Sequence, residues 1–406
     1  MNIFKRFIFR TYQKGLYLAS FFLNFSEPIV TSGEGCSKEV YKAIKEMGKT
    51  HPLIVTDDSL YKLGLLDFLI KGLEENNVEY SIYKDVRPNP TTDNVENALS
   101  IYKGENCDSI IAFGGGSSID TAKVVGALVS NPKKNISKLK GLLKINKKYK
   151  YFIAVPTTAG TGSEATVAAV IVDEKNHDKY AINDPKLIPS YAFLDPTLLL
   201  KLPSKITSTT GMDALTHAIE SYIGKSGTKK TKKYALESIQ LINKNLLNSY
   251  NNPDNVLYRE NMLIASYKAG VSFTRAYVGY VHAIAHSLGG LYNIPHGYAN
   301  AILLPIILKH FGSSVYSSLA RIYDYINNDN KDINKEEKAK AVISYIEELN
   351  EKMGIIPDFS YIKEEDIDFL ARHSYKEANP LYPVPKEFDL KDFVSIIEEL
   401  RNYGKD

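Results

Sequence analysis

The chain has 406 residues, of which 44% are hydrophobic and 24% charged, and its formal net charge is +3. A chain of this length exceeds what one hydrophobic core usually holds, so two domains are expected. The basic residues are scattered rather than clustered, which argues against a nucleic-acid partner. Cys36 and Cys107 form neither a metal-type spacing nor a disulfide framework, which favours the reducing cytoplasm.

The first 27 residues combine basic side chains with apolar runs. Four basic residues precede the apolar run at residues 15–25, which is too short to span a bilayer and is followed by no small-residue cleavage pattern. We therefore predict that residues 1–27 form an amphipathic helical extension. Such a helix could pack on the body of the protein, on a partner subunit or on a membrane surface. The basic residues are Lys5, Arg6, Arg10 and Lys14.

Residues 28–203 read as strands alternating with helices. Short runs rich in Val, Ile and Phe, such as "HPLIVTDD", "EYSIYKDV", "DSIIAFGGG" and "YFIAVPTTAG", end in turn residues. Helical patterns such as "SLYKLGLLDFLIKGLEENN" and "NVENALSIYKG" separate them. This alternation predicts an α/β domain with a parallel, Rossmann-like sheet covered by helices.

Residues 204–406 carry helical periodicity to the end of the chain, as in "KKYALESIQLINKNLLNSY" and "EEKAKAVISYIEELNEKMG". We predict an all-α domain here. The polar segment "INNDNKDINKEEK" is predicted to be a solvated loop between helices.

A glycine-rich turn in "DSIIAFGGGSSIDTAKVVGALV" joins a strand directly to a helix. Gly114, Gly115 and Gly116 would let the backbone approach a bulky anion. Ser117 or Ser118 could cap a helix whose free N–H groups and dipole favour phosphate. The spacing is neither GxGxxG nor a P-loop, so a tight turn without a ligand remains the alternative.

Two further strand ends carry polar groups suited to a dinucleotide. "VPTTAGTGSEAT" offers hydroxyl groups for a diphosphate or a ribose, although a plain polar loop would look the same. Asp57 closes the strand "PLIVTD", where a carboxylate can accept hydrogen bonds from a ribose diol or serve simply as a strand-end cap or turn former. Its charge would repel a 2′-phosphate, which favours NAD over NADP. The hydroxyls belong to Thr157, Thr158, Thr161 and Ser163.

Histidines and one aspartate form a second pattern in the helical half. Asp213 and His217 lie four residues apart in "GMDALTHAIE", and His282 and His286 do so in "VHAIAHSLGG". We expect Gly289 and Gly290 to end the second helix, so that His296 returns on a loop. A single such histidine would be structural, but the combination indicates a site for Zn²⁺ or Fe²⁺.

These segments together resemble the iron-containing (group III) alcohol dehydrogenase family over nearly the whole chain after residue 28. The resemblance rests on "FGGGSSIDTAK", "VPTTAGTGSEAT", "GMDALTHAIE" and "HAIAHSLGGLYNIPHG". It implies Fe²⁺ rather than Zn²⁺, held by Asp213, His217, His282 and His296, with His286 unliganded near the nicotinamide. It places Asp57 and Asn89 near the adenosine, and Lys179, Leu198 and Leu202 along the cofactor. The phosphates would lie among Gly115, Gly116, Ser117, Ser118, Asp120, Thr157, Thr158 and Thr161.

The activity implied is a metal-dependent alcohol dehydrogenase or aldehyde reductase that transfers hydride between NAD(H) and a small primary alcohol or aldehyde. A cytoplasmic homodimer is the expected form. The family often has an arginine soon after the Asn-Pro near its substrate pocket, whereas this chain has Leu381 there. The alternatives are an NAD-dependent lyase resembling dehydroquinate synthase and a non-catalytic subunit that binds metal and nucleotide.

Overall fold

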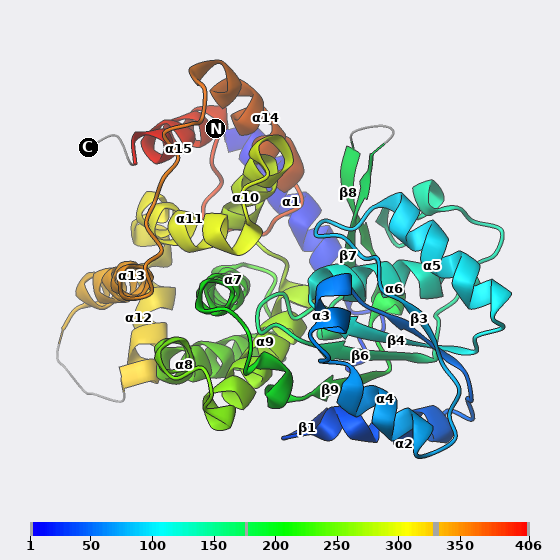
Figure 1. Cartoon of the computed structure of the whole chain (residues 1–406). Helices are drawn as coiled ribbons and strands as arrows, with labels where there is room; N and C mark the ends of the chain where they lie inside the picture. Colours follow the sequence, from blue (N-terminus) through cyan, green and yellow to red (C-terminus); the bar gives the residue numbers. More distant parts are fainter. Residues whose placement is uncertain (1–2, 175–177, 328–332, 404–406) are drawn as a thin grey trace. The chain divides into compact units, whose positions relative to one another are not determined.

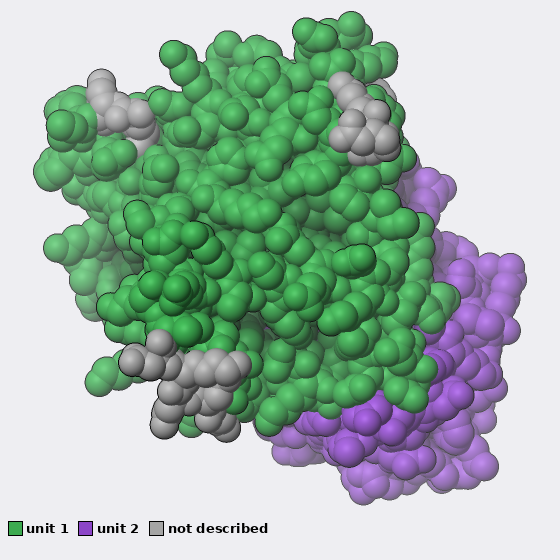
Figure 2. Space-filling view, turned by 90° about the vertical axis from the view of Figure 1, so that its left-hand side faces the viewer, with its two compact units in different colours: residues 1–23, 203–252, 271–406 green, residues 24–202, 253–270 purple. Residues whose placement is uncertain are grey.

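The computed structural model describes residues 3–174, 178–327 and 333–403. The chain forms two compact units, shown in separate colours in Figure 2. Unit 1 comprises residues 1–23, 203–252 and 271–406, and unit 2 comprises residues 24–202 and 253–270. Unit 2 is the α/β part and unit 1 is helical, which confirms the predicted fold class.

Unit 2 contains a six-stranded sheet in which every strand pair is parallel. The predicted apolar runs form β2, β3, β4 and β6, and the residues of β2, β4 and β6 are all buried. Burial on both faces explains why these strands are continuous runs of Ile, Val and Ala without alternation. The order across the sheet is β1 (Ile29–Ser32), β9 (Tyr191–Leu194), β6 (Phe152–Pro156), β4 (Ser109–Gly114), β2 (Pro52–Val55) and β3 (Ser81–Tyr83).

Helices lie on both faces of this sheet, with α5 and α6 on one side and α2 and α4 on the other (Figure 1). The predicted single helix after β2 is in fact two helices, because Gly64 adopts a φ of 68° between α3 and α4. The bounds are α2 Val40–Glu46, α3 Asp58–Lys62, α4 Asp67–Glu74, α5 Thr92–Gly104 and α6 Gly116–Ser130. Short 3₁₀ turns are η1 Cys36–Glu39, η2 Ile136–Leu139, η3 Ser163–Ala165, η4 Pro185–Leu187 and η5 Pro196–Leu199.

A second, three-stranded sheet in unit 2 was not predicted. It has the order β5 (Gly141–Leu142), β8 (Asp178–Asn183) and β7 (Ala168–Asp173). The β7 and β8 strands pair antiparallel, whereas β5 and β8 are parallel.

Unit 1 is built from helices throughout its described residues, as predicted. Residues 253–270, which include the larger part of α9, belong to unit 2 instead. The predicted inter-helix loop falls partly on residues 328–332, which lie outside the described residues. No described helix is both long and apolar enough to cross a bilayer. The helices are α1 Ile3–Ser20, α7 Ser204–Ile223, α8 Lys229–Asn251, α9 Val256–Ala276, α10 Tyr280–Tyr292, α11 His296–Phe311, α12 Ser313–Asn327, α13 Lys335–Lys352, α14 Ile367–Ala378 and α15 Leu390–Asn402, with the 3₁₀ turn η6 Glu364–Asp366.

The predicted N-terminal helix is α1, and its buried residues Phe9, Gln13 and Ser20 lie on one face, which packs on other parts of unit 1. Arg10 donates to the carbonyl oxygens of Val384 at 2.8 Å and Pro385 at 3.1 Å, and it forms an ion pair with the buried Glu387. Gln13, also buried, donates to the Pro380 and Tyr382 carbonyl oxygens at 3.0 and 2.9 Å. These buried polar contacts hold α1 in one orientation.

Candidate metal centre and nucleotide-binding loops

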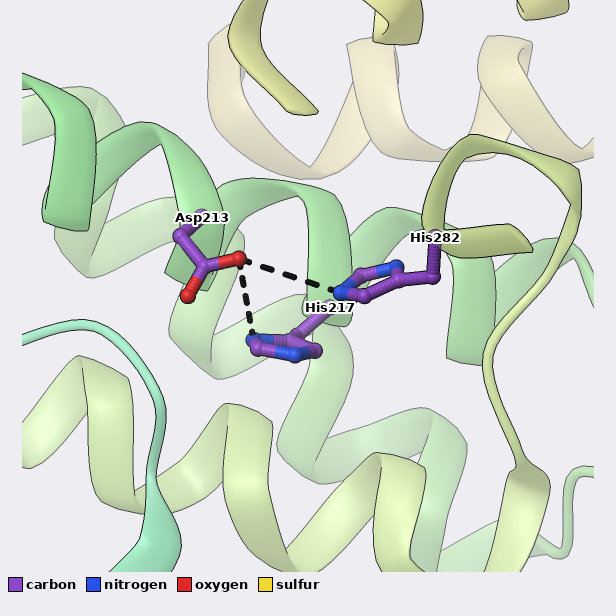
Figure 3. A group of neighbouring side chains, drawn as sticks. All are labelled: Asp213, His217 and His282. Carbon is purple, nitrogen blue, oxygen red and sulfur yellow. Dashed lines mark ion pairs between the residues drawn. The ribbon is translucent and has the colours of Figure 1, made fainter. Parts of the chain in front are cut away.

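Helices α7 and α10 bring a carboxylate and two imidazoles together inside unit 1 (Figure 3). Asp213 and His217 share one face of α7, and His282 comes from α10. The Asp213 Oδ1 atom lies 4.0 Å from His217 Nδ1 and 3.8 Å from His282 Nε2. All three side chains are buried, and their candidate ligand atoms lie within 4.8 Å of one another. This donor set suits a borderline metal such as Fe²⁺ or Zn²⁺.

His296 approaches the same carboxylate, with its Nε2 3.5 Å from Asp213 Oδ1. The expected route of the chain to this residue was wrong in two respects. Helix α10 continues through Gly289 and Gly290 to Tyr292, and Asn293 at a φ of 53° follows it as the C-cap. His296 is then the first residue of α11 rather than part of a loop. Asparagine tolerates the left-handed conformation, so it can supply the turn expected of glycine.

The contacts of Asn300 on α11 indicate that this cluster can hold a cation. Its Nδ2 atom lies 2.7 Å from Asp213 Oδ1, 3.3 Å from His282 Nε2 and 3.0 Å from His296 Nε2. Three acceptors from three helices thus converge on one amide donor. The residues present therefore fit a metal ion, because a cation needs the same convergence of lone pairs.

Glu220, which the sequence interpretation missed, fixes the orientation of His282. Its carboxylate lies 2.6 Å from His282 Nδ1 and accepts the N–H groups of Gly279 at 2.8 Å and Val281 at 2.9 Å. A proton on Nδ1 leaves the Nε2 lone pair facing Asp213. Glu220 stands seven residues after Asp213 on α7, a helical spacing that could have revealed it.

The lowered pKa of His282 agrees with a neutral imidazole. Burial, together with repulsion by the neighbouring histidines, lowers the pKa of His282 well below its usual value. Burial likewise raises the pKa of Glu220 to about 7, against the hydrogen bonds that stabilise its charge.

His286 has a different partner from the other histidines of this stretch. Its Nδ1 lies 2.7 Å from Glu377 Oε1, and the Tyr382 hydroxyl donates to the same oxygen at 2.8 Å. Its ring stacks on that of His296, with centroids 5.1 Å apart. Burial alone would raise the pKa of Glu377, but the charge and hydrogen bonds of His286 and Tyr382 lower it overall. Glu377 was also missed by the sequence interpretation.

In unit 2, the predicted cofactor segments follow three neighbouring strands. Asp57 follows β2, the glycine turn follows β4, and the threonine segment follows β6. The order β6-β4-β2 in a parallel sheet places all three at one edge. Ligands of open α/β sheets bind at this carboxyl edge.

The glycine turn and the threonine segment lie directly against each other. The Thr157 N–H donates to the Gly114 carbonyl oxygen at 3.1 Å. A Cβ on Gly116 would lie only 3.0 Å from Thr161 Cγ2, and one on Gly115 3.4 Å from Thr158 Oγ1. The expected serine cap was wrong: Gly115 is the N-cap of α6 without a side-chain cap, and Ser117 and Ser118 lie in the first helical turn. The N–H groups of that turn have no partner within the helix.

Several predicted cofactor residues also have partners within unit 2. Asp57 accepts the Leu60 N–H at 3.0 Å as the N-cap of α3. Asp120 is half-buried on α6, accepting from Ser163 Oγ at 2.7 Å and the Val170 N–H at 2.9 Å.

The other predicted cofactor residues differ in their contacts and burial. Lys179 Nζ donates to Asn89 Oδ1 at 2.8 Å, so these two lie side by side. Leu198 is buried in η5, and Leu202 is half-buried.

Comparison with known proteins decides the family. Residues 28–196 match the iron-containing alcohol dehydrogenases, and residues 207–401 match the C-terminal domain of the same family. The chain belongs to the iron-containing alcohol dehydrogenase family. It is therefore an oxidoreductase of the alcohol dehydrogenase and aldehyde reductase type, and the non-catalytic alternative is set aside.

Individual members of the family resemble the chain over most of its length. It is 40% identical to alcohol dehydrogenase 4 of Schizosaccharomyces pombe, covering 87% of this chain and 84% of that protein. It is 35% identical to the NAD-dependent methanol dehydrogenase of Bacillus methanolicus, covering 87% of this chain and 93% of that protein. A crystal structure of 1,3-propanediol oxidoreductase superposes with a TM-score of 0.89 at 32% identity, covering 93% of this chain and 99% of that one.

Gly297, beside His296, couples the packing of α11 to the cluster. A Cβ at this position would lie 2.3 Å from the Thr209 carbonyl oxygen of α7. We expect Gly297→Ala to lower the free energy of unfolding by about 2 kcal/mol and to weaken metal binding, because α11 must move away from α7. Urea unfolding, followed by circular dichroism, measures the first effect.

Gly290→Ala is the matched control, because a Cβ there meets no atom within 4 Å. It should be neutral or stabilising by up to about 1 kcal/mol, as alanine is the better helix former. Equal stability losses in the two variants would contradict the role given to Gly297.

Proposed function

We propose that this chain interconverts small primary alcohols and aldehydes, using NAD(H) and an Fe²⁺ ion held by Asp213, His217, His282 and His296. The buried Asp–His cluster carries this proposal, because a metal ion held there would stabilise the alkoxide in oxidation and polarise the carbonyl in reduction. The name of the Bacillus methanolicus relative supports NAD as the cofactor. Zn²⁺ would also suit the ligand types, so iron is proposed on family grounds.

We further propose a division of labour along the chain. Residues 28–203 would bind the dinucleotide and residues 204–406 the metal, with residues 1–27 as an added element. The diphosphate would lie at the glycine turn, against the first N–H groups of α6 and the hydroxyls of Thr157, Thr158 and Thr161. Asp57 and Asn89 would contact the adenosine. Lys179, Leu198 and Leu202 would line the cofactor, while Asp120 supports the turn.

The side chains of the cluster have separate tasks in this proposal. When bound, the metal would supply Lewis acidity toward the substrate oxygen, and NAD would accept the hydride. Glu220 keeps the proton of His282 on Nδ1, so that Nε2 stays available as a donor. His286 would take the alcohol proton at Nε2, since its Nδ1 faces Glu377. The negative charge of Glu377 would stabilise the resulting imidazolium.

We also propose a cytoplasmic homo-oligomer, with a dimer as the smallest form. Cys36 and Cys107 are buried free thiols, which suits a reducing compartment. Light scattering coupled to gel filtration gives the mass of the assembly in solution.

An anaerobic assay of the iron-loaded protein tests the activity. NADH and then NADPH absorbance would be followed with a panel of short aldehydes, and we expect NADH to be consumed. Metal-loaded protein that consumes neither cofactor would overturn the proposed function. It would also reopen the lyase alternative, in which NAD is used only transiently.

Asp57 is expected to set the preference for NAD. Asp57→Ser keeps an N-cap on α3 but removes the charge that would repel a 2′-phosphate. We expect the ratio of kcat/KM for NADPH over NADH to rise roughly tenfold or more. Asp58→Ser, at the next position of the same helix, is the control and should leave the ratio unchanged. An unchanged ratio in Asp57→Ser would remove this residue from the adenosine site.

A further inference from the structure

The undocked side of α1 carries several exposed apolar side chains, and the turn that follows α1 adds Phe22. Phe4, Phe7 and Phe22 are 72%, 67% and 91% exposed. Such exposure is costly in water, and contiguous apolar patches on soluble proteins usually mark contact sites. We call this the outer face of the N-terminal segment. Its members are Ile3, Phe4, Phe7, Ile8, Leu18 and Phe22.

The outer face and the docked face of α1 have separate roles. Phe9, Gln13 and Ser20 are buried on the docked side, whereas positions 4, 7, 8, 11, 14, 15 and 18 follow the helical spacing of the opposite side. The family match begins only at residue 28, so the segment is not part of the matched alcohol dehydrogenase region. The helix is held firmly on the protein, and its apolar side chains are presented outward.

The charges of the segment indicate what covers this face. Residues 1–26 contain four basic and no acidic side chains. Arg10 is neutralised by Glu387, whereas Lys14 is exposed on the outer face itself, seven residues after Phe7 and four before Leu18. A second copy packed on this face would bury Lys14 among apolar and basic groups, which is unfavourable. At a lipid surface its long side chain can reach the phosphate layer instead.

We propose that the outer face of the N-terminal segment binds the protein to an anionic membrane surface. Phenylalanine, isoleucine and leucine side chains enter the boundary between headgroups and acyl chains, while Lys14 pairs with lipid phosphates. The helix lies in the plane of the interface and does not cross the bilayer. This surface is independent of the alcohol dehydrogenase activity.

Co-sedimentation of the full chain with vesicles tests the proposal. Vesicles of phosphatidylcholine alone are compared with vesicles that also contain phosphatidylglycerol, at low and high salt. We expect binding to the anionic vesicles that weakens with salt, as an electrostatic contribution requires. The variant Phe4→Asn/Phe7→Asn/Leu18→Asn should reduce partitioning by more than about tenfold, because three apolar side chains no longer enter the lipid. Lys14→Gln should reduce binding to anionic vesicles only.

Substitution is preferable to deletion here, because α1 also holds the segment of residues 380–387 through Arg10 and Gln13. Ile356→Asn/Phe369→Asn, at exposed apolar positions outside α1, is the matched control and should bind vesicles like the parent. Thermal melting and NADH turnover should be unchanged in all four proteins. Equal binding by the parent and the triple variant would overturn the proposal. The proposal would also be overturned if the parent did not bind vesicles and the triple variant formed a smaller assembly by light scattering. The outer face would then be an interface between copies of the chain.

Discussion

His282→Ala is expected to lose the bound metal and the activity together. The substitution removes a buried imidazole whose Nε2 lies 3.8 Å from Asp213 Oδ1, and alanine offers no donor in its place. We expect turnover to fall by about a thousandfold or more, since Lewis-acid assistance is worth several kcal/mol. Elemental analysis after anaerobic loading with Fe²⁺ and desalting measures the metal, and NADH oxidation measures the activity.

Glu220→Gln is a second, milder variant, because it keeps all four candidate ligands. An amide at this position must turn an N–H toward the N–H groups of Gly279 or Val281 or toward His282 Nδ1. The imidazole then loses its fixed tautomer, and metal affinity should fall by roughly ten- to a hundredfold. An intermediate affinity between the parent and His282→Ala would show that the carboxylate acts through the histidine.

His310→Ala controls for the loss of a histidine in general. His310 lies at the other end of α11, where its Nε2 contacts Glu399 at 2.8 Å. This variant should retain metal and activity. If His282→Ala instead binds Fe²⁺ with the affinity of the parent, His282 is not a ligand and the proposed set is wrong.

The parts of the site that follow from local spacing could be predicted from the sequence. Asp213 and His217 face one way because they stand four residues apart on one helix, whatever surrounds that helix. The three predicted cofactor segments each follow an expected strand, and they lie at one sheet edge because parallel strands present their carboxyl ends together. In both cases the regular geometry of one kind of element suffices.

The supporting contacts could not be predicted in the same way, because they join distant parts of the chain. Glu220 and His282 are 62 residues apart, and His286 and Glu377 are 91 apart. No periodicity links such pairs; only the packing of the helices does. Asn300 is intermediate, because its spacing of four from His296 was visible but became informative only once His296 was known to begin a helix.

The local errors have a common physical cause. Gly289 and Gly290 were expected to end α10, and a serine was expected to cap α6, because those residues favour such positions on average. In the structure Asn293 takes the left-handed position, and Gly115 takes the cap. Propensities of about 1 kcal/mol per residue are weak and are routinely overridden by the tertiary surroundings of the helix end.

His286→Ala is expected to keep the metal but to turn over more slowly, which separates this residue from its neighbour one helical turn away. The Nδ1 of His286 is committed to Glu377, and its ring stacks on His296. Loss of an acid–base group typically costs about a hundred- to ten-thousandfold in rate. We expect the lower part of this range, because the side chain is 33% exposed and water can partly replace it. Steady-state kcat with an alcohol substrate and the iron content of the same sample are the two measurements.

Two variants around His286 distinguish proton transfer from mere packing. Glu377→Gln retains the shape of the side chain but cannot stabilise an imidazolium, so kcat should fall while iron content stays at the parent level. Tyr382→Phe removes a hydrogen bond to the same carboxylate and should have a smaller effect in the same direction. Loss of iron from His286→Ala would instead make His286 a ligand. In that case the division between His282 and His296 as ligands and His286 as the proton carrier would have to be abandoned.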